Sequence, residues 1–107
     1  MDAQLKRGVL DSAVLSVLNR NDSYGYAIIK EIEPVMTISE STLYPILKRL
    51  ELQKQVICYS REYQGRLRKY YSITKEGRIA LLNFLEEWKE LVKVCEFIAQ
   101  GRGSQDE

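Results

Sequence analysis

Segment 39–74 constrains the fold most, because a helical repeat of apolar residues leads directly into a hairpin signal. The apolar side chains recur at positions i, i+3, i+4 and i+7, which predicts a helix with one buried face. They are Leu43, Ile46, Leu47 and Leu50. The face that is predicted to stay outside carries Thr42, Tyr44, Pro45, Lys48 and Arg49.

A two-stranded hairpin is predicted immediately after this helix, with strands at 56–63 and 66–73. Gly65 supplies the positive φ that a tight turn at Gln64-Gly65 needs. A turn of two residues fixes the cross-strand pairs as Tyr63–Arg66, Tyr59–Tyr70, Cys58–Tyr71 and Val56–Ile73. In this register one face is expected to be buried. It carries Val56, Cys58, Tyr71 and Ile73.

Positive charge is concentrated on residues 48–75. This segment holds eight Lys/Arg and two Asp/Glu, whereas the rest of the chain holds eight and thirteen. The net charge of the whole chain is only +1, so the distribution is more informative than the total. A basic patch of this kind is expected of a phosphate-binding surface. The alternative is a hairpin whose charges only face water.

Two further helices are predicted before the repeat helix. The first covers residues 1–19, and its apolar side chains extend over more than half of the helix circumference. It is therefore expected to pack both on its own domain and on something else. The second covers residues 24–35, with Ala27, Ile28 and Ile32 facing inward.

The two junctions of the repeat helix leave alternatives open. The link at 36–38 is extended and is a candidate for a third, minimal strand beside the hairpin. Either Ser39 or Ser41 caps the start of the helix. At its end there is no glycine, so Lys54 or Gln55 is expected to adopt a strained or alternative cap.

The last helix is predicted from Lys75 to about Gln100, with Thr74 as its N-cap. Six side chains along it are spaced 4, 3, 4, 3 and 4 residues apart, which is an a/d heptad seam. They are Leu81, Leu85, Trp88, Val92, Cys95 and Ala99. A small chain cannot cover so long a seam, so a second copy is expected to do so, together with Leu10 and Val14 of the first helix.

Three motifs resemble the PadR family of transcriptional regulators. They are Ser41-Thr42-Leu43-Tyr44-Pro45 with Lys48-Arg49-Leu50-Glu51, the wing motif at 65–74, and Ser23-Tyr24-Gly25-Tyr26 upstream. The resemblance implies a mostly α, α+β fold: a winged helix-turn-helix with a two-stranded β wing and a long C-terminal dimerisation helix. We expect a DNA-binding domain at 1–73, the dimerisation helix at 74–100 and a disordered polar tail at 101–107.

The winged-helix layout places candidate DNA contacts on the repeat helix, on the wing and at the start of the second helix. They are Tyr26, Ser41, Thr42, Tyr44, Pro45, Lys48, Arg49, Gly65, Arg66, Arg68 and Lys69. The ammonium of Lys48 and the hydroxyl groups suit phosphate, and the wing cations suit phosphate or the minor groove. Arg49 has an alternative, because it could form an ion pair within the domain. Tyr26 could equally belong to the core.

Trp88 is the only tryptophan, and it lies at the centre of the seam. The plain interpretation is an aromatic residue in a dimer core. The resemblance implies a second interpretation, since multidrug-responsive members of the family carry a tryptophan at the corresponding place. Two such rings across a two-fold axis would hold a flat hydrophobic effector.

The residue types present argue against enzymatic activity and against a membrane-spanning segment. The chain has no histidine, and Cys58 and Cys95 belong to different elements, so no metal site is expected. No nucleophile–base pair is visible, so neither a cofactor nor enzymatic activity is expected. No secretory signal is visible and no apolar run approaches the roughly 20 residues that span a bilayer, so a cytoplasmic location is expected.

The predicted function is sequence-specific binding of double-stranded DNA by a homodimer that represses transcription. The resemblance implies an inverted-repeat operator of the ATGT…ACAT kind. The alternative is a winged-helix module that binds protein and not DNA. The grouped cations Arg66, Arg68 and Lys69 favour DNA, because a module that only binds protein has no need of them.

Overall fold

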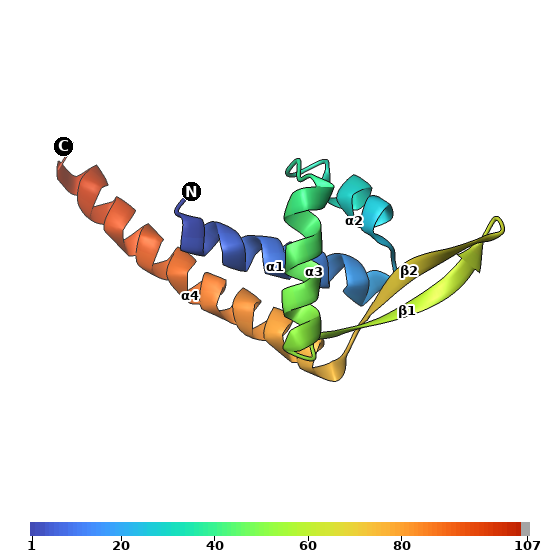
Figure 1. Cartoon of the computed structure of the whole chain (residues 1–107). Coiled ribbons are helices and arrows are strands. Elements are labelled where there is room, and N and C mark those ends of the chain that lie inside the picture. Colours follow the sequence, from blue (N-terminus) through green and yellow to red (C-terminus); the bar gives the residue numbers. More distant parts are fainter. Residues whose placement is uncertain (106–107) are drawn as a thin grey trace.

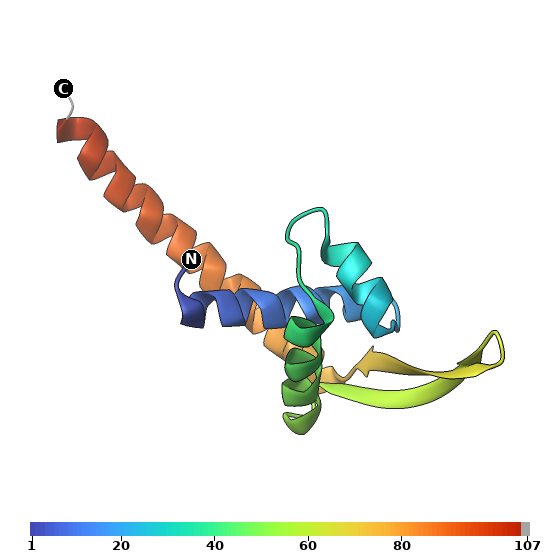
Figure 2. The ribbon, with the colours of Figure 1, turned by 45° about the horizontal axis from the view of Figure 1, so that its top comes forward.

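The computed structural model describes residues 1–105, with side chains as far as residue 101. This part of the chain contains four helices and one two-stranded antiparallel sheet (Figure 1). In order they are α1 (Ala3–Arg20), α2 (Gly25–Ile32), α3 (Glu40–Leu52), β1 (Val56–Tyr63), β2 (Arg66–Ile73) and α4 (Lys75–Gln105). From a body of α1, α2 and α3, the hairpin and the end of α4 extend in opposite directions (Figure 1, Figure 2). The predicted winged-helix fold is confirmed.

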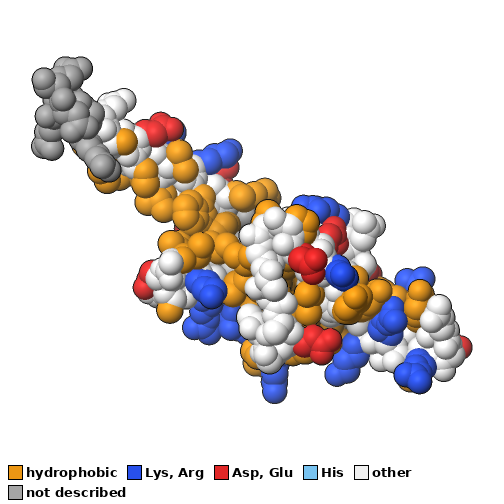
Figure 3. All heavy atoms as spheres, turned by 90° about the horizontal axis from the view of Figure 1, so that it is seen from above, with side chains coloured by type: hydrophobic (Ala, Val, Ile, Leu, Met, Phe, Trp, Pro, Cys, Tyr) orange, Lys and Arg blue, Asp and Glu red, His pale blue; other side chains and the backbone are white. Residues whose placement is uncertain are grey.

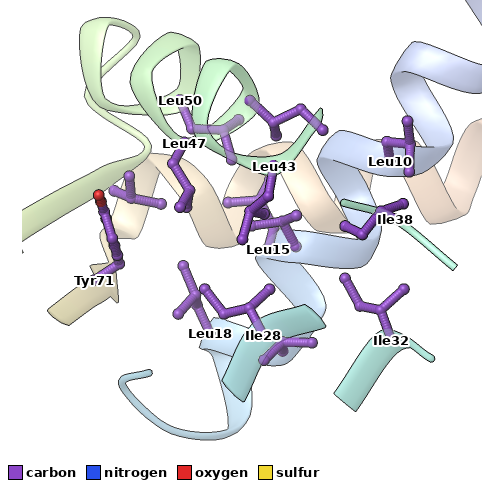
Figure 4. Packing of buried hydrophobic residues seen from close by; sticks show 14 of the residues in the cluster. Leu10, Leu15, Leu18, Ile28, Ile32, Ile38, Leu43, Leu47, Leu50 and Tyr71 are labelled. Carbon is purple, nitrogen blue, oxygen red and sulfur yellow. The ribbon is translucent and has the colours of Figure 1, made fainter. Parts of the chain in front are cut away.

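The hydrophobic core lies where α1, α2 and α3 meet the base of the hairpin and the start of α4. Figure 4 shows Leu43 and Leu47 of α3 pointing toward Leu15 of α1 and Ile28 of α2. All four apolar residues of the α3 repeat are buried, which confirms the predicted inner face. Each such side chain stabilises the fold by about 1.5–3 kcal/mol relative to exposure.

Three residues predicted for the dimer interface belong to this core. Leu10, Val14 and Leu81 are 6 %, 0 % and 8 % exposed within a single chain. A chain of this size needs the centre of α1 to close its own core, because small domains bury a limited share of their surface. These three side chains therefore have little surface left for a second copy, and their place in a dimer interface stays a prediction.

The link at 36–38, which the sequence left as a candidate third strand, forms no strand in the described chain. The loop between α1 and α2 occupies that edge of β2: the Ser23 N–H donates to Tyr71 O at 3.1 Å, and the Tyr71 N–H donates to Ser23 O at 2.7 Å. Helix α2 also ends earlier than predicted, at Ile32, since Pro34 has no N–H to continue the helical hydrogen bonds.

Both ends of α3 have side-chain or backbone caps. Ser39 is the N-cap, because its Oγ accepts the Thr42 N–H at 3.2 Å. At the other end Lys54 has a φ of +60°, and the Gln55 N–H donates to Leu50 O at 2.9 Å. This is a Schellman cap without glycine, and Lys54 takes the left-handed position predicted for residue 54 or 55.

The hairpin has the predicted register, from Val56 opposite Ile73 to Tyr63 opposite Arg66. Gln64 joins Gly65 in the left-handed region, with φ values of +53° and +79°, as a type I′ turn requires. The predicted buried face is confirmed. Val56 and Tyr71 are buried on it, and Cys58 and Ile73 are partly buried.

Helix α4 begins as predicted, because Thr74 Oγ1 accepts the Gly77 N–H at 3.1 Å. It continues to Gln105, so most of the tail predicted to be disordered is helical, and 106–107 lie outside the described residues. A helix that already has many turns extends without a new nucleus, which explains why it passes Gly101.

Candidate nucleic-acid interface

The outer face of α3 is open to solvent. Ser41, Thr42, Tyr44, Pro45 and Lys48 are all exposed. The N-cap hydroxyl orders the first turn, since Ser39 Oγ lies 2.8 Å from Ser41 Oγ and 3.2 Å from Thr42 Oγ1. This face therefore presents two hydroxyls, a phenol and an ammonium, which are all groups that contact phosphates or base edges.

Arg49 does not share this exposed face. Its guanidinium forms an ion pair with Asp11 of α1, and both side chains are only about a quarter exposed, at 24 % and 23 %. Nε of Arg49 also donates to Asp11 Oδ2 at 3.4 Å. The structure thus shows the intradomain ion pair that sequence left as the alternative, and Arg49 holds α3 against α1.

A hollow of about 520 Å³ lies between the start of α2, the outer face of α3 and the wing. We call it the α2–α3–wing hollow. It is lined by Tyr24, Gly25, Tyr26, Tyr44, Tyr63, Arg68, Lys69 and Tyr71. Tyr44 packs so closely on Gly25 that a Cβ there would lie 2.5 Å from its Oη. Tyr24, the N-cap of α2, makes no side-chain capping bond, so the first N–H groups of α2 lack that partner.

Tyr26 is 57 % exposed at this helix start, so the alternative of a core tyrosine is wrong. The Lys30 ammonium lies 5.8 Å from the centre of its ring. Tyr26 therefore belongs to the same solvent-facing surface as Tyr44.

The cations of the wing are not equivalent. Arg66 and Lys69 are exposed, as is Gly65 at the turn. Arg68 is partly buried, because its guanidinium carbon lies 4.0 Å from the ring centre of Tyr24 and 4.2 Å from that of Tyr63. Figure 3 shows lysine and arginine side chains along the hairpin. The sequence did not distinguish Arg68 from its neighbours.

Two tyrosines of the hairpin have raised pKa values. Tyr59 donates to Asp22 Oδ2 at 2.6 Å, and this hydrogen bond raises the pKa of Tyr59 above its usual value. Burial, followed by the neighbouring Cys58, raises the pKa of Tyr71 to about 12. A tyrosine phenol is already neutral at physiological pH, and these upward shifts keep both groups uncharged beside the basic wing.

A second hollow, of about 330 Å³, lies between α1 and α4. We call it the Trp88 pocket. It is lined by Gln4, Leu5, Gly8, Phe84, Glu87, Trp88 and Leu91. The Trp88 and Phe84 ring centres are 6.0 Å apart with a 54° tilt, and Trp88 is half-buried. Beyond this pocket the apolar side chains of α4 are exposed, and Figure 3 shows them as a continuous stripe.

The described residues contain no cluster of acidic, cysteine or histidine side chains suited to a metal ion. Cys58 and Cys95 are both free thiols. Over the same part of the chain, no helix combines the length and the apolar character needed to cross a membrane.

Residues 14–83 match the model of the transcriptional regulator PadR-like family. The match includes α2, α3, the whole hairpin and the first turns of α4, and so it covers every part of the α2–α3–wing hollow. The chain belongs to the PadR-like family.

Solved PadR structures share the fold over almost their whole length. A PadR-like transcription factor from Bacteroides fragilis is 32 % identical with a TM-score of 0.81, and the match covers 90 % of this chain and 95 % of that one. A PadR family regulator from Clostridium difficile is 32 % identical with a TM-score of 0.78, covering 84 % and 97 %. The Escherichia coli transcriptional regulator YqjI is 36 % identical over 93 residues, which are 83 % of this chain but 42 % of YqjI.

In this PadR-like chain the sequence did not identify the partners of two arginines. The Asp11–Arg49 ion pair joins residues 38 positions apart, and the stack of Arg68 on Tyr24 joins residues from different elements. For Arg68 the sequence did contain one signal. The cross-strand register sets Arg68 directly opposite Arg61. Two like charges at opposed positions need compensation from somewhere else.

Proposed function

We propose that this PadR-like regulator is a cytoplasmic, DNA-binding repressor that binds an inverted-repeat operator as a homodimer. The observation that carries the proposal is the α2–α3–wing hollow, where the start of α2, whose first N–H groups have no side-chain cap, lies beside tyrosines and Lys69 around one space. These are the groups that hold a phosphodiester backbone at a helix start. Transcription regulators of this family are not expected to be enzymes.

The residues around the hollow divide into two tasks. Lys48, Ser41 and Tyr44 suit phosphate contacts, and the exposed wing cations Arg66 and Lys69 suit phosphate or the minor groove. Thr42 and Pro45 lie on the exposed face of α3 beside them and suit contact with base edges in the major groove.

Replacing Arg66 and Lys69 together by alanine should weaken binding to all duplexes. Removing one cation from one phosphate lowers the slope of log affinity against log salt by about 0.9, so two residues in two protomers should lower it by up to about 3.6. The measurement is fluorescence anisotropy with an ATGT…ACAT duplex and a scrambled duplex over a range of salt concentrations.

The matched control is Lys93→Glu, which changes the charge of the chain by the same amount on an exposed part of α4. It should leave the slope close to that of the native chain. If the wing variant also keeps the native slope, the wing does not contact the backbone. If the native chain does not bind the operator more tightly than the scrambled duplex, the proposed specific binding is wrong and the protein-interaction module becomes the better explanation.

A hydrophobic effector is a further part of the proposal, supported by the Trp88 pocket. Helix α1 lines this pocket through Leu5 and Gly8, and the same helix carries Asp11, which holds Arg49 of α3. A ligand that moves α1 would therefore move the DNA-binding helix. By linkage, such a ligand binds the DNA-bound protein more weakly.

A planar apolar dye should quench Trp88 fluorescence, and operator DNA should reduce its affinity. Trp88 is the only tryptophan, so the signal comes from this pocket. Coupling free energies of this kind change affinity by roughly 5- to 150-fold. The scrambled duplex serves as the control and should leave dye affinity unchanged. If no dye quenches Trp88, or if quenching is equal with and without operator DNA, the effector part of the proposal is wrong.

A further inference from the structure

Arg68 is held between two tyrosine rings. Its guanidinium lies 4.0 Å from the centre of Tyr24 and 4.2 Å from the centre of Tyr63, which are distances of direct stacking. Its Nη1 atom is buried and, among the residues that the structure describes, has no hydrogen-bond partner. A nitrogen buried in this way is not available to a DNA phosphate, so the role of Arg68 differs from that of Arg66.

The hairpin register explains why Arg68 needs these rings. Arg61 and Arg68 face each other directly across the two strands, and opposed like charges destabilise a sheet. Each guanidinium has its own ring contacts: Arg61 lies 5.3 Å from the centre of Tyr70, and Arg68 lies between Tyr24 and Tyr63. The faces of aromatic rings attract cations, so the tyrosines offset the repulsion between the strands.

The same stack connects the wing to the helical body. Tyr63 is the last residue of β1, beside the turn, whereas Tyr24 is the N-cap of α2. Tyr24 also packs edge-on against Tyr70, with ring centres 5.4 Å apart. The backbone bridge between Ser23 and Tyr71 lies near the base of the wing. The side-chain stack extends this connection between the wing and the helical body toward the tip of the hairpin.

We propose that Tyr24, Arg68 and Tyr63 are positioning residues that set the angle of the wing to α2. The inference rests on the proposed DNA-binding function and deepens it. An isolated two-stranded ribbon is only marginally stable. Without this stack the wing would become ordered only when DNA binds, and the free-energy cost of that ordering would lower the affinity for DNA. With the stack in place, Arg66 and Lys69 are held where they meet the same duplex as α3.

The test compares substitutions that keep or remove a ring without changing charge. Tyr63→Leu should bind the operator roughly tenfold more weakly than Tyr63→Phe, with the same salt slope, because both variants lack the hydroxyl and only phenylalanine keeps the ring. Tyr63 is 46 % exposed, so its replacement leaves the core intact. Arg68→Lys should show a similar decrease in affinity at an unchanged slope, because an ammonium keeps the charge but cannot stack as a plane.

A second measurement does not depend on DNA. Amide hydrogen exchange at Ser23 and Tyr71 should be faster in Tyr63→Leu than in Tyr63→Phe, because the wing opens more often. The inference is overturned if the two variants bind and exchange alike, or if Arg68→Ala lowers the salt slope as much as Arg66→Ala does. Failure of the native chain to bind DNA would refute the proposed function, whereas the exchange result would still test the stack.

Discussion

Replacing Gly77 by alanine should destabilise the protein severely, by about 3 kcal/mol. Gly77 is buried in the first turn of α4, and a Cβ there would lie 2.2 Å from the Gln55 carbonyl oxygen and 2.7 Å from Ile73 Cγ1. The carbonyl cannot move aside easily, because it accepts the Thr74 N–H at 3.0 Å. Since domains are stable by only about 5–15 kcal/mol, this decrease is a large fraction of the total.

The measurement is urea unfolding followed by circular dichroism, at one fixed protein concentration. Gly101→Ala is the matched control in the same helix, because nothing lies within 4 Å of a Cβ at that position. That variant should be neutral or more stable, by up to about 1 kcal/mol from helix propensity. Equal unfolding midpoints for the two variants would contradict this prediction, because they would show that α4 can move away from the Gln55 backbone without lowering the free energy of unfolding.

Introducing charge on the exposed seam of α4 should abolish the proposed dimer and, with it, tight operator binding. Leu85 and Val92 are 49 % and 48 % exposed in the single chain, so Leu85→Glu with Val92→Glu should leave the monomer folded. Across a dimer interface the added carboxylates would be buried without partners. A monomer reaches one half-site only, and without the tethered second half-site the affinity should fall by about 100-fold or more.

Sedimentation equilibrium at micromolar concentration gives the oligomeric state, and anisotropy with full and half operators gives the affinities. The control is again Lys93→Glu, which changes the net charge by the same amount without touching the predicted seam. It should remain dimeric and bind the full operator. A native chain that sediments as a folded monomer would show that the apolar stripe of α4 has another use.

The sequence determined the elements whose signals are local. The spacing of Leu43, Ile46, Leu47 and Leu50 defined the buried face of α3, because helical geometry places those positions on one side. The two-residue turn at Gln64-Gly65 set the hairpin register, because a strand can slip only if the turn changes length. The exposed face of α3 and most of the basic wing followed from these two patterns.

The tertiary structure decided which distant elements meet. Ser23, and not the link at 36–38, pairs with β2, because the α1–α2 loop reaches that edge of the sheet. Leu10, Val14 and Leu81 close the core of a single chain, since an apolar pattern records burial but not the partner that buries it. Arg49 and Arg68 look like surface cations in the sequence. Arg49 reaches Asp11, and Arg68 reaches two tyrosine rings, only because packing brings those groups within a few ångströms.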